Sequence, residues 1–104
     1  MAERRGFRLL VDSQNRGFAT YGPKQPYMYI QDIYVRPAFR RGGIASAMAD
    51  YIAEEARMEG CTHLLGSVDS NSHGWGDSLK ALISYGFVPL RVTGDVGIFL
   101  EKKL

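Results

Sequence analysis

The stretch that decides the fold runs from residue 35 to residue 45 and reads Val35-Arg36-Pro37-Ala38-Phe39-Arg40-Arg41-Gly42-Gly43-Ile44-Ala45. It joins a β-branched and aromatic run to a helical repeat of apolar residues. The first N–H groups of a helix have no partner within it and carry the positive end of its dipole, so an anion is the natural ligand there. Glycines allow close approach and arginines add charge. We therefore predict a phosphate-binding loop, with a plain connector as the alternative.

Outward from this loop the patterns predict alternating strands and helices. The expected strands are 7–11, 18–21, 27–35, 63–68, 87–92 and 96–102, and the expected helices are 44–59 and 78–85. The central strand–helix–strand unit should make strands 27–35 and 63–68 parallel, with antiparallel hairpins on either side. The sequence thus predicts a single domain over residues 1–104, of the α/β class, with a mixed β-sheet flanked by helices.

Two finer expectations concern the second and third strands. Gly22 to Pro26 should end the second strand, because proline cannot donate to a ladder. In the third, unbroken alternation would set Tyr29, Gln31, Ile33 and Val35 on one face, and Met28, Ile30, Asp32 and Tyr34 on the other. The turn between the last two strands is expected at residues 93–95.

Composition excludes several classes of protein. The 104 residues are 45% hydrophobic and 23% charged, which is typical of a globular domain, and no run approaches the ~18 apolar residues of a membrane span. One cysteine, Cys61, allows no internal disulfide and, with His63 and His73, completes no zinc site, so we expect no metal. The net charge of +2 is too small to indicate nucleic acid, whose binding domains usually carry a more basic, clustered stripe. With no signal-peptide pattern, we expect a cytoplasmic protein.

Three segments resemble a known family. Arg40-Arg41-Gly42-Gly43-Ile44-Ala45 resembles the Arg/Gln-x-x-Gly-x-Gly/Ala signature of the GNAT superfamily of N-acetyltransferases. Upstream, Ile33-Tyr34-Val35-Arg36-Pro37 looks like that family's strand and its approach to the loop. Downstream, residues 79–87 resemble its second signature, a short helix that closes in Gly86-Phe87. The resemblance spans residues 27–89.

This resemblance implies a splayed central sheet that holds acetyl-coenzyme A between two parallel strands. The residues it assigns to the cofactor are Ile33, Tyr34 and Val35 for the pantetheine arm, Arg40, Arg41, Gly42, Gly43, Ile44, Ala45 and Ser46 for the pyrophosphate, and Asn71. The implied activity moves an acetyl group from acetyl-CoA to a primary amine of a small molecule or a protein. The alternative is a weakly active or inactive CoA-binding or protein-interaction module.

The sequence departs from the family pattern in its catalytic residues and its length. The family's general-acid tyrosine falls at Leu82, so Tyr85, one turn later, is the remaining candidate acid. Candidate bases are Asp32, if a bulge rotates it, and His73. The chain starts near the family's second strand, and the missing N-terminal segment would wall the acceptor site. Either a second subunit, in a homodimer, supplies that wall, or the acceptor is a large exposed group.

Overall fold

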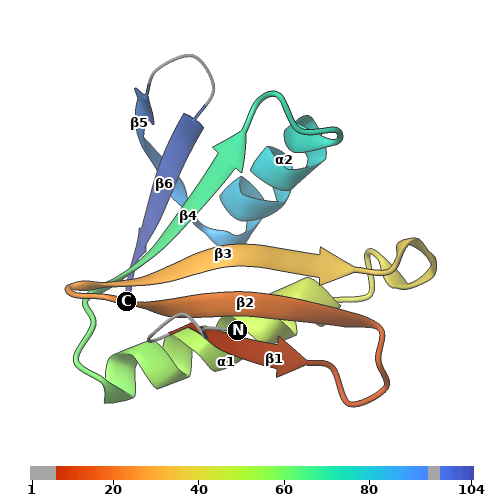
Figure 1. Ribbon diagram of the computed structural model, residues 1–104, viewed down its shortest axis with the longest axis horizontal. Coiled ribbons are helices and arrows are strands. Elements are labelled where there is room, and N and C mark those ends of the chain that lie inside the picture. Colours follow the sequence, from red (N-terminus) through yellow and green to blue (C-terminus); the bar gives the residue numbers. More distant parts are fainter. Residues whose placement is uncertain (1–6, 94–96) are drawn as a thin grey trace, which may run out of the picture.

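The computed structural model describes residues 7–93 and 97–104, and in them the chain forms one mixed sheet with two α-helices on it (Figure 1). The strands are β1 (Arg8–Val11), β2 (Gly17–Lys24), β3 (Tyr27–Val35), β4 (His63–Asp69), β5 (Val88–Thr93) and β6 (Gly97–Lys103). Their order in the sheet is β1-β2-β3-β4-β6-β5, with β3 parallel to β4 and the other pairs antiparallel. The predicted α/β class and the parallel centre are confirmed.

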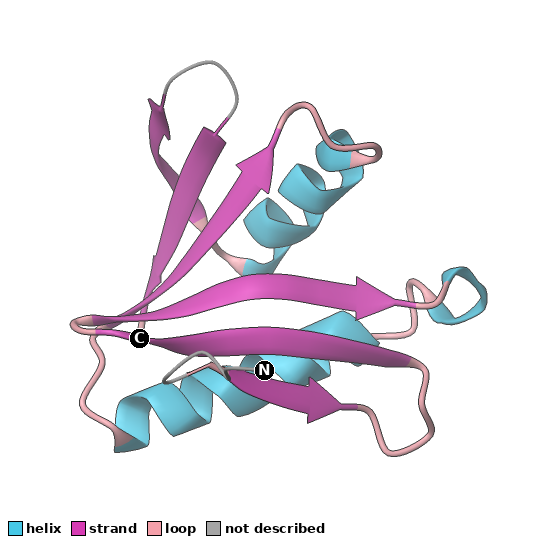
Figure 2. Ribbon diagram, in the orientation of Figure 1, coloured by secondary structure: helices cyan, strands magenta, loops and turns pink. Residues whose placement is uncertain are grey.

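Both helices cover the same face of the sheet, which we call the helix face (Figure 2). Helix α1 (Ile44–Met58) packs on β2, β3 and β4, and α2 (Trp75–Tyr85) packs on β4. The Tyr85 hydroxyl donates a hydrogen bond to Asp50 Oδ1 at 2.5 Å, which joins the two helices directly. The opposite side, called the open face, carries no helix of the described chain. Neither α-helix in residues 7–93 and 97–104 is long and apolar enough to cross a membrane.

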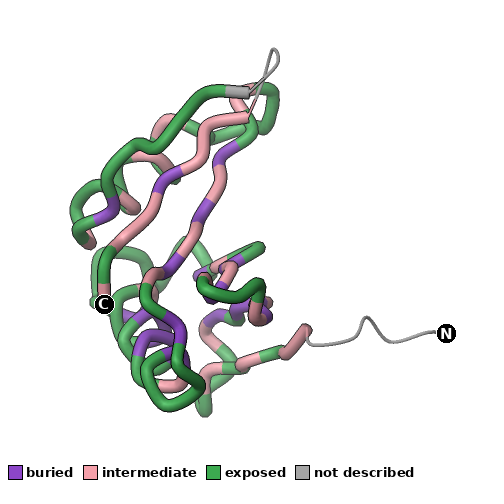
Figure 3. Tube along the Cα trace, turned by 90° about the vertical axis from the view of Figure 1, so that its left-hand side faces the viewer, coloured by how far each residue is buried: buried purple, intermediate pink, exposed green. Residues whose placement is uncertain are grey.

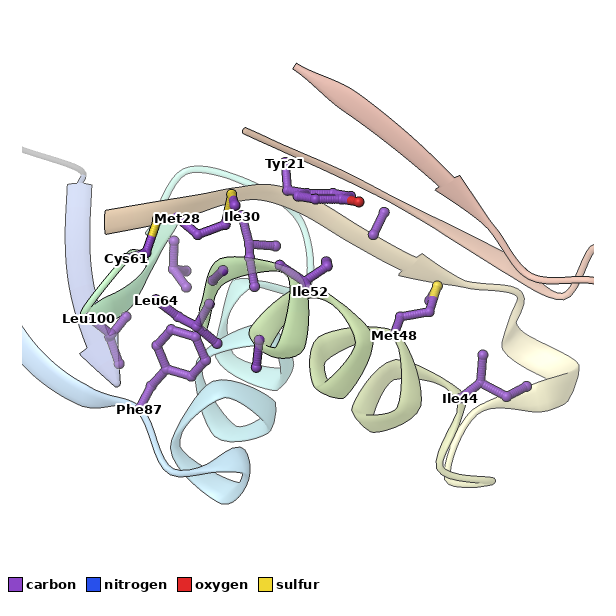
Figure 4. Packing of buried hydrophobic residues seen from close by; sticks show 14 of the residues in the cluster. Tyr21, Met28, Ile30, Ile44, Met48, Ile52, Cys61, Leu64, Phe87 and Leu100 are labelled. Atoms are coloured by element: carbon purple, nitrogen blue, oxygen red, sulfur yellow. The ribbon is translucent and has the colours of Figure 1, made fainter. Parts of the chain in front are cut away.

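The core lies between α1 and the sheet (Figure 4). Ile44, Met48 and Ile52 recur one helical turn apart and point at the strands, as the 3.6-residue period requires. The largest fully buried side chains are Met28, Ile52, Leu64 and Leu100. Figure 3 shows buried positions alternating with more exposed ones along the strands, which is the pattern of a sheet covered on one face.

Most predicted boundaries lie within a few residues of the observed ones, and strand 27–35 and the helix start at Ile44 are confirmed. The second strand does end within the predicted stretch Gly22 to Pro26, but it ends at Lys24 and not at the predicted Tyr21. The odd-numbered residues of β2 direct their main-chain groups towards β1, and the pairs that the structure describes in that ladder end at Arg8 and Tyr21, before Pro23 is reached. The expected helix 78–85 begins earlier, at Trp75, behind Gly74 in a left-handed conformation. In the turn expected at 93–95, residues 94 and 95 lie outside the described residues.

The predicted alternation along β3 is wrong beyond Ile30. Thr20 pairs with Asp32, whereas the next residue of β2, Tyr21, pairs with Ile30, so Gln31 is an extra residue in a β-bulge. One inserted residue exchanges the faces of everything after it. As a result Ile33 and Val35 join Met28 and Ile30 on the helix face, and Asp32 and Tyr34 turn to the open face.

Candidate active site

The two central strands separate like the arms of a fork. β3 and β4 pair over four residues only, from Tyr27 with His63 to Ile30 with Gly66, and then diverge (Figure 1). Within the described chain no strand fills the gap between the arms beyond this point. An opening between two strands of one sheet offers main-chain hydrogen bonds to an extended ligand.

The bulge decides which main-chain groups face the fork. Arg36 N donates to Arg16 O at 2.8 Å, and opposite residues of an antiparallel pair alternate between bonded and non-bonded. Tyr34 therefore directs its main-chain groups to β2, while Ile33 and Val35 direct theirs into the fork. Of the three residues predicted to bind a pantetheine arm, Ile33 and Val35 therefore face the fork and Tyr34 does not.

The loop at the open end of the β3 arm converges on the first turn of α1. Arg41 and Gly43 both have positive φ, 70° and 84°, with Gly42 between them. The first helical hydrogen bond runs from Ala47 N to Gly43 O at 2.9 Å, so the N–H groups of residues 44–46 precede it without intrahelical partners. The first turn carries no acidic side chain. Such an arrangement of N–H groups at a helix start suits an anion, and a phosphate in particular.

Arg40 fixes the loop to the strand. Its Nε donates to Val35 O at 2.8 Å, and its guanidinium carbon lies 5.5 Å from the centre of the Tyr34 ring. Because Val35 O points into the fork, this contact holds the strand end and the loop in one geometry. Arg41 is exposed next to it.

The candidate general acid, Tyr85, is engaged elsewhere. Its hydroxyl proton is directed at Asp50, and Lys102 Nζ lies 5.7 Å from its ring centre. Burial first, and then the Asp50 carboxylate, raise the pKa of Tyr85 above its usual range. These contacts make Tyr85 a link between α1 and α2, and its role as an acid stays a prediction.

The α2 side chain at the base of the fork is Leu82. Gly66 is the last β4 residue paired with β3, and a Cβ added there would lie 3.5 Å from Leu82 Cδ2. The position at which the family resemblance expects a tyrosine therefore stands beside the point where the arms separate, and here it is apolar.

The other predicted residues are exposed and dispersed. Asp32 lies on the open face opposite Thr20. The bulge therefore rotates Asp32, which was the condition for it to be a candidate base. Asn71 and His73 lie in the loop after β4, which leaves the second arm at the same end as the predicted phosphate-binding loop leaves the first. In the described residues no hydrogen bond connects Asp32, His73 and Tyr85 with one another. Nor do three or more His, Cys, Asp or Glu side chains of the described chain gather as metal ligands would.

Sequence reasoning missed a pair of hydroxyls at the base of the fork. Tyr29 Oη and Ser67 Oγ lie 2.8 Å apart, both half-buried, and bridge β3 and β4 on the open face. The only signal for it was a serine inside the apolar run of residues 64–68, which a buried strand does not require.

Comparisons with known proteins place this fork and loop in context. Among curated protein sequences none matches the chain. Solved structures that are similar include an acetyltransferase from Bacillus cereus, which is 19% identical with a TM-score of 0.72 over 94% of this chain and 71% of the other. A Bacillus anthracis protein described as a streptothricin acetyltransferase, solved with acetyl-CoA, is 17% identical, with a TM-score of 0.81 over 98% and 66%. The PaiA N-acetyltransferase of Thermoplasma acidophilum, solved with CoA, is 17% identical, with a TM-score of 0.75 over 95% and 62%.

The similar structures show only that the chain shares their fold. The family is shown by the sequence. The sequence profile of the acetyltransferase (GNAT) family matches residues 3–75, more than half of the chain, and this span includes the β3 arm, the loop between β3 and α1, α1 itself and β4. Because this profile matches more than half of the sequence, the chain belongs to the GNAT acetyltransferase family.

Proposed function

We propose that this protein transfers an acetyl group from acetyl-CoA to a primary amine. The observation that carries the proposal is the fork between β3 and β4, in which the main chain of Ile33 and Val35 faces the gap and the first turn of α1 follows at the open end of the β3 arm. Two proteins of the same fold were solved with acetyl-CoA and with CoA, which supports this class of ligand.

The expected reaction uses few side chains. The amine nitrogen attacks the thioester carbonyl carbon, the new C–N bond forms as the C–S bond breaks, and the leaving thiolate takes up a proton. A main-chain N–H of Ile33 or Val35 would hydrogen-bond the carbonyl oxygen as negative charge develops on it. The proton of the amine would pass to Asp32, to His73 or to water, and much of the rate would come from holding the two reactants together.

A second candidate is a CoA-binding or interaction module with little turnover. The observation that favours it is Leu82 at the base of the fork, together with the hydroxyl of Tyr85 directed at Asp50. Loss of general-acid help costs about 10²–10⁴ in rate. A thiol with a pKa near ~8.5 is a moderate leaving group, so this loss weakens transfer without abolishing it.

Two glycines give a matched test of the cofactor site. Gly43 and Gly60 stand at opposite ends of α1 with φ of 84° and 83°, and an added Cβ meets no atom within 4 Å at either. Gly43→Trp and Gly60→Trp therefore carry the same backbone strain, about 1–2 kcal/mol. Isothermal titration of acetyl-CoA should show binding by the wild type and Gly60→Trp and none by folded Gly43→Trp.

Turnover separates the two candidates. We expect release of free CoA thiol above the blank when a panel of primary amines is added with acetyl-CoA. Binding without release for any amine would leave the binding module as the function. Equal binding by the Gly43→Trp and Gly60→Trp variants would move the cofactor away from this loop.

A further inference from the structure

The edge strand β1 presents unpaired main-chain groups. It stands at one end of the sheet order, and no described strand pairs with its outer side. Asp12 N donates to Gly17 O at 3.0 Å, so the bonded pairs of the β1–β2 ladder are those of Asp12, Leu10 and Arg8. The N–H and C=O groups of the two residues between them, Leu9 and Val11, point away from the sheet, and a second strand could pair with them.

The side chains along this edge are apolar and exposed. Leu9 and Val11 point to the open face and are 65% and 50% exposed. Beside them on the same face lie Phe18, opposite Val11, and Tyr34, whose ring centre is 5.7 Å from that of Phe18. Monomeric proteins seldom leave an apolar strand edge and an adjoining apolar patch uncovered.

The helix-face side of the edge is hollowed. A cleft of about 380 Å³ separates β1 from α1, and its apolar wall is formed by Leu10, Ile44, Ala47, Met48 and Tyr51. Leu10 is half-buried at its rim. An apolar side chain on the helix face of an added strand would enter this cleft.

We propose that the occupant of this edge is a second copy of the chain, whose β1 pairs with β1 in an antiparallel, two-fold arrangement centred on Leu10. A two-fold axis must pair residues whose main-chain groups face outward with residues of the same kind, so the centre lies on a residue of β1 and not between two residues. A centre at Arg8 puts the two Arg8 side chains of the dimer opposite each other, and like charges repel. A centre at Leu9 puts Arg8 opposite a leucine, and one at Val11 puts Leu10 opposite an aspartate. A centre at Leu10 places Leu9 opposite Val11, Leu10 opposite Leu10, and Arg8 opposite Asp12 of the second copy.

This register is complementary on both faces. On the open face, Leu9 of each copy lies opposite Val11 of the other, so the dimer gains two pairs of apolar side chains that are exposed in the single chain. On the helix face, Arg8 already contacts Glu55 and Glu59, and Asp12 already pairs with Arg16 at 2.7 Å, so the new contact between Arg8 and Asp12 joins two existing ion pairs. The sheets of the two copies become continuous. The cleft shares Gly42, Gly43 and Ile44 with the predicted phosphate-binding loop. The pairing of the two β1 strands uses no group of that loop, so it can be tested without acetyl-CoA.

The register predicts a rescue experiment. Leu9→Lys and Val11→Glu change exposed side chains and should each raise the dimer Kd by about tenfold or more, because a two-fold interface contains each change twice. Mixing the two variants places a lysine opposite a glutamate across the interface and should restore the dimer. The matched control is Val92→Lys, a 70% exposed valine on the other edge strand, β5, which should leave the dimer intact.

Light scattering after gel filtration reads the outcome, with circular dichroism to verify that each variant is folded. The wild type should have twice the 11.6 kDa of one chain. A wild type that stays monomeric at its highest soluble concentration would overturn the proposal. So would a Leu9→Lys variant that dimerises as well as the wild type, or a mixture of Leu9→Lys and Val11→Glu that stays monomeric.

Discussion

Leu82 is the residue whose identity most affects the expected rate. It stands beside Gly66 at the base of the fork, and it is the position at which the family resemblance expects the general-acid tyrosine. We predict that Leu82→Tyr raises kcat for acetyl transfer by about tenfold or more, since general-acid help is worth about 10²–10⁴. Leu82→Phe adds a ring of nearly the same size without the hydroxyl, and should not raise kcat. Equal kcat values for these two variants, measured at saturating acetyl-CoA, would show that position 82 does not supply a proton.

Tyr85→Phe is the complementary control. Because the Tyr85 hydroxyl donates to Asp50, its removal should lower the free energy of unfolding by about 1 kcal/mol and change kcat less than about threefold. Asp50→Asn tests the same link from the other helix. A fall in kcat of a hundredfold in Tyr85→Phe alone would restore Tyr85 as the acid.

Asp12 gives stability a pH dependence. Its carboxylate accepts hydrogen bonds from Arg16 Nε at 2.7 Å and from the main-chain N–H groups of Gln14 and Arg16, and the Arg16 side chain is the largest cause that lowers the pKa of Asp12 to about 2. Because the pKa is lower in the folded chain than in the unfolded chain, where it is about 3.9, the ionised carboxylate stabilises the fold above about pH 4. That stabilisation is lost as the pH falls towards 2.

The test compares urea midpoints of the wild type and Asp12→Asn between pH 2 and 6. The wild type should be the more stable above about pH 4, and the difference should shrink towards pH 2. The remaining acidic groups are common to both proteins, so they cancel. A difference that stays constant over the whole range would mean that the ionised carboxylate is not what stabilises this turn.

Residues in local patterns were predictable, and residues in long-range pairs were not. Gly42, Gly43 and the helix start at Ile44 follow from neighbours in sequence, because glycine conformation and helical period are local properties. The Tyr29–Ser67 and Tyr85–Asp50 contacts join residues 38 and 35 positions apart, and nothing near either member marks its partner. The candidate catalytic residues stay predictions for the same reason.

At the scale of elements, β3 shows what a strand pattern leaves open. Its bounds, Tyr27–Val35, were predictable from β-branched and aromatic content, but its faces were not. The bulge at Gln31 arises from the register with β2, which the sequence of β3 does not contain. Because of it, the main-chain groups that face the fork belong to Ile33 and Val35.

This assignment predicts which amides a bound ligand protects. At saturating acetyl-CoA the amide exchange of Ile33 and Val35, followed by NMR, should slow by about tenfold or more relative to the free protein, because a ligand in the fork accepts or covers these N–H groups. Tyr34 is the internal control, since its N–H already faces Phe18 of β2 and should change much less. Equal slowing at all three residues would indicate general stabilisation with no ligand between the arms.

At the scale of the whole molecule, the fork divides the sheet into two arms. β1, β2 and β3 lie on one side with α1, and β4, β6 and β5 on the other with α2. The two arms are connected by four residue pairs between β3 and β4 and by the packing of α1 on β4. Side-chain hydrogen bonds add to this in the pairs Tyr29–Ser67, Tyr27–Glu101 and Tyr85–Asp50. A chain of 104 residues buries a modest share of its surface when it folds, so a ligand that touches both arms should contribute a large part of its stability.

The last prediction concerns how much a bound ligand stabilises the two arms. Acetyl-CoA at a hundred times its Kd should add about 2.7 kcal/mol to the free energy of unfolding. For a domain near this size each 1 kcal/mol raises Tm by roughly 4–8 °C, so the expected shift is about 10 °C or more. Gly60→Trp should show the same shift and Gly43→Trp none, with protein concentration held fixed because the proposed dimerisation would also affect Tm. The shift requires binding but no turnover. An inactive protein that shows it would be a CoA-binding module, whereas a Gly43→Trp variant that shows it in full would place the stabilising contacts away from the α1 start.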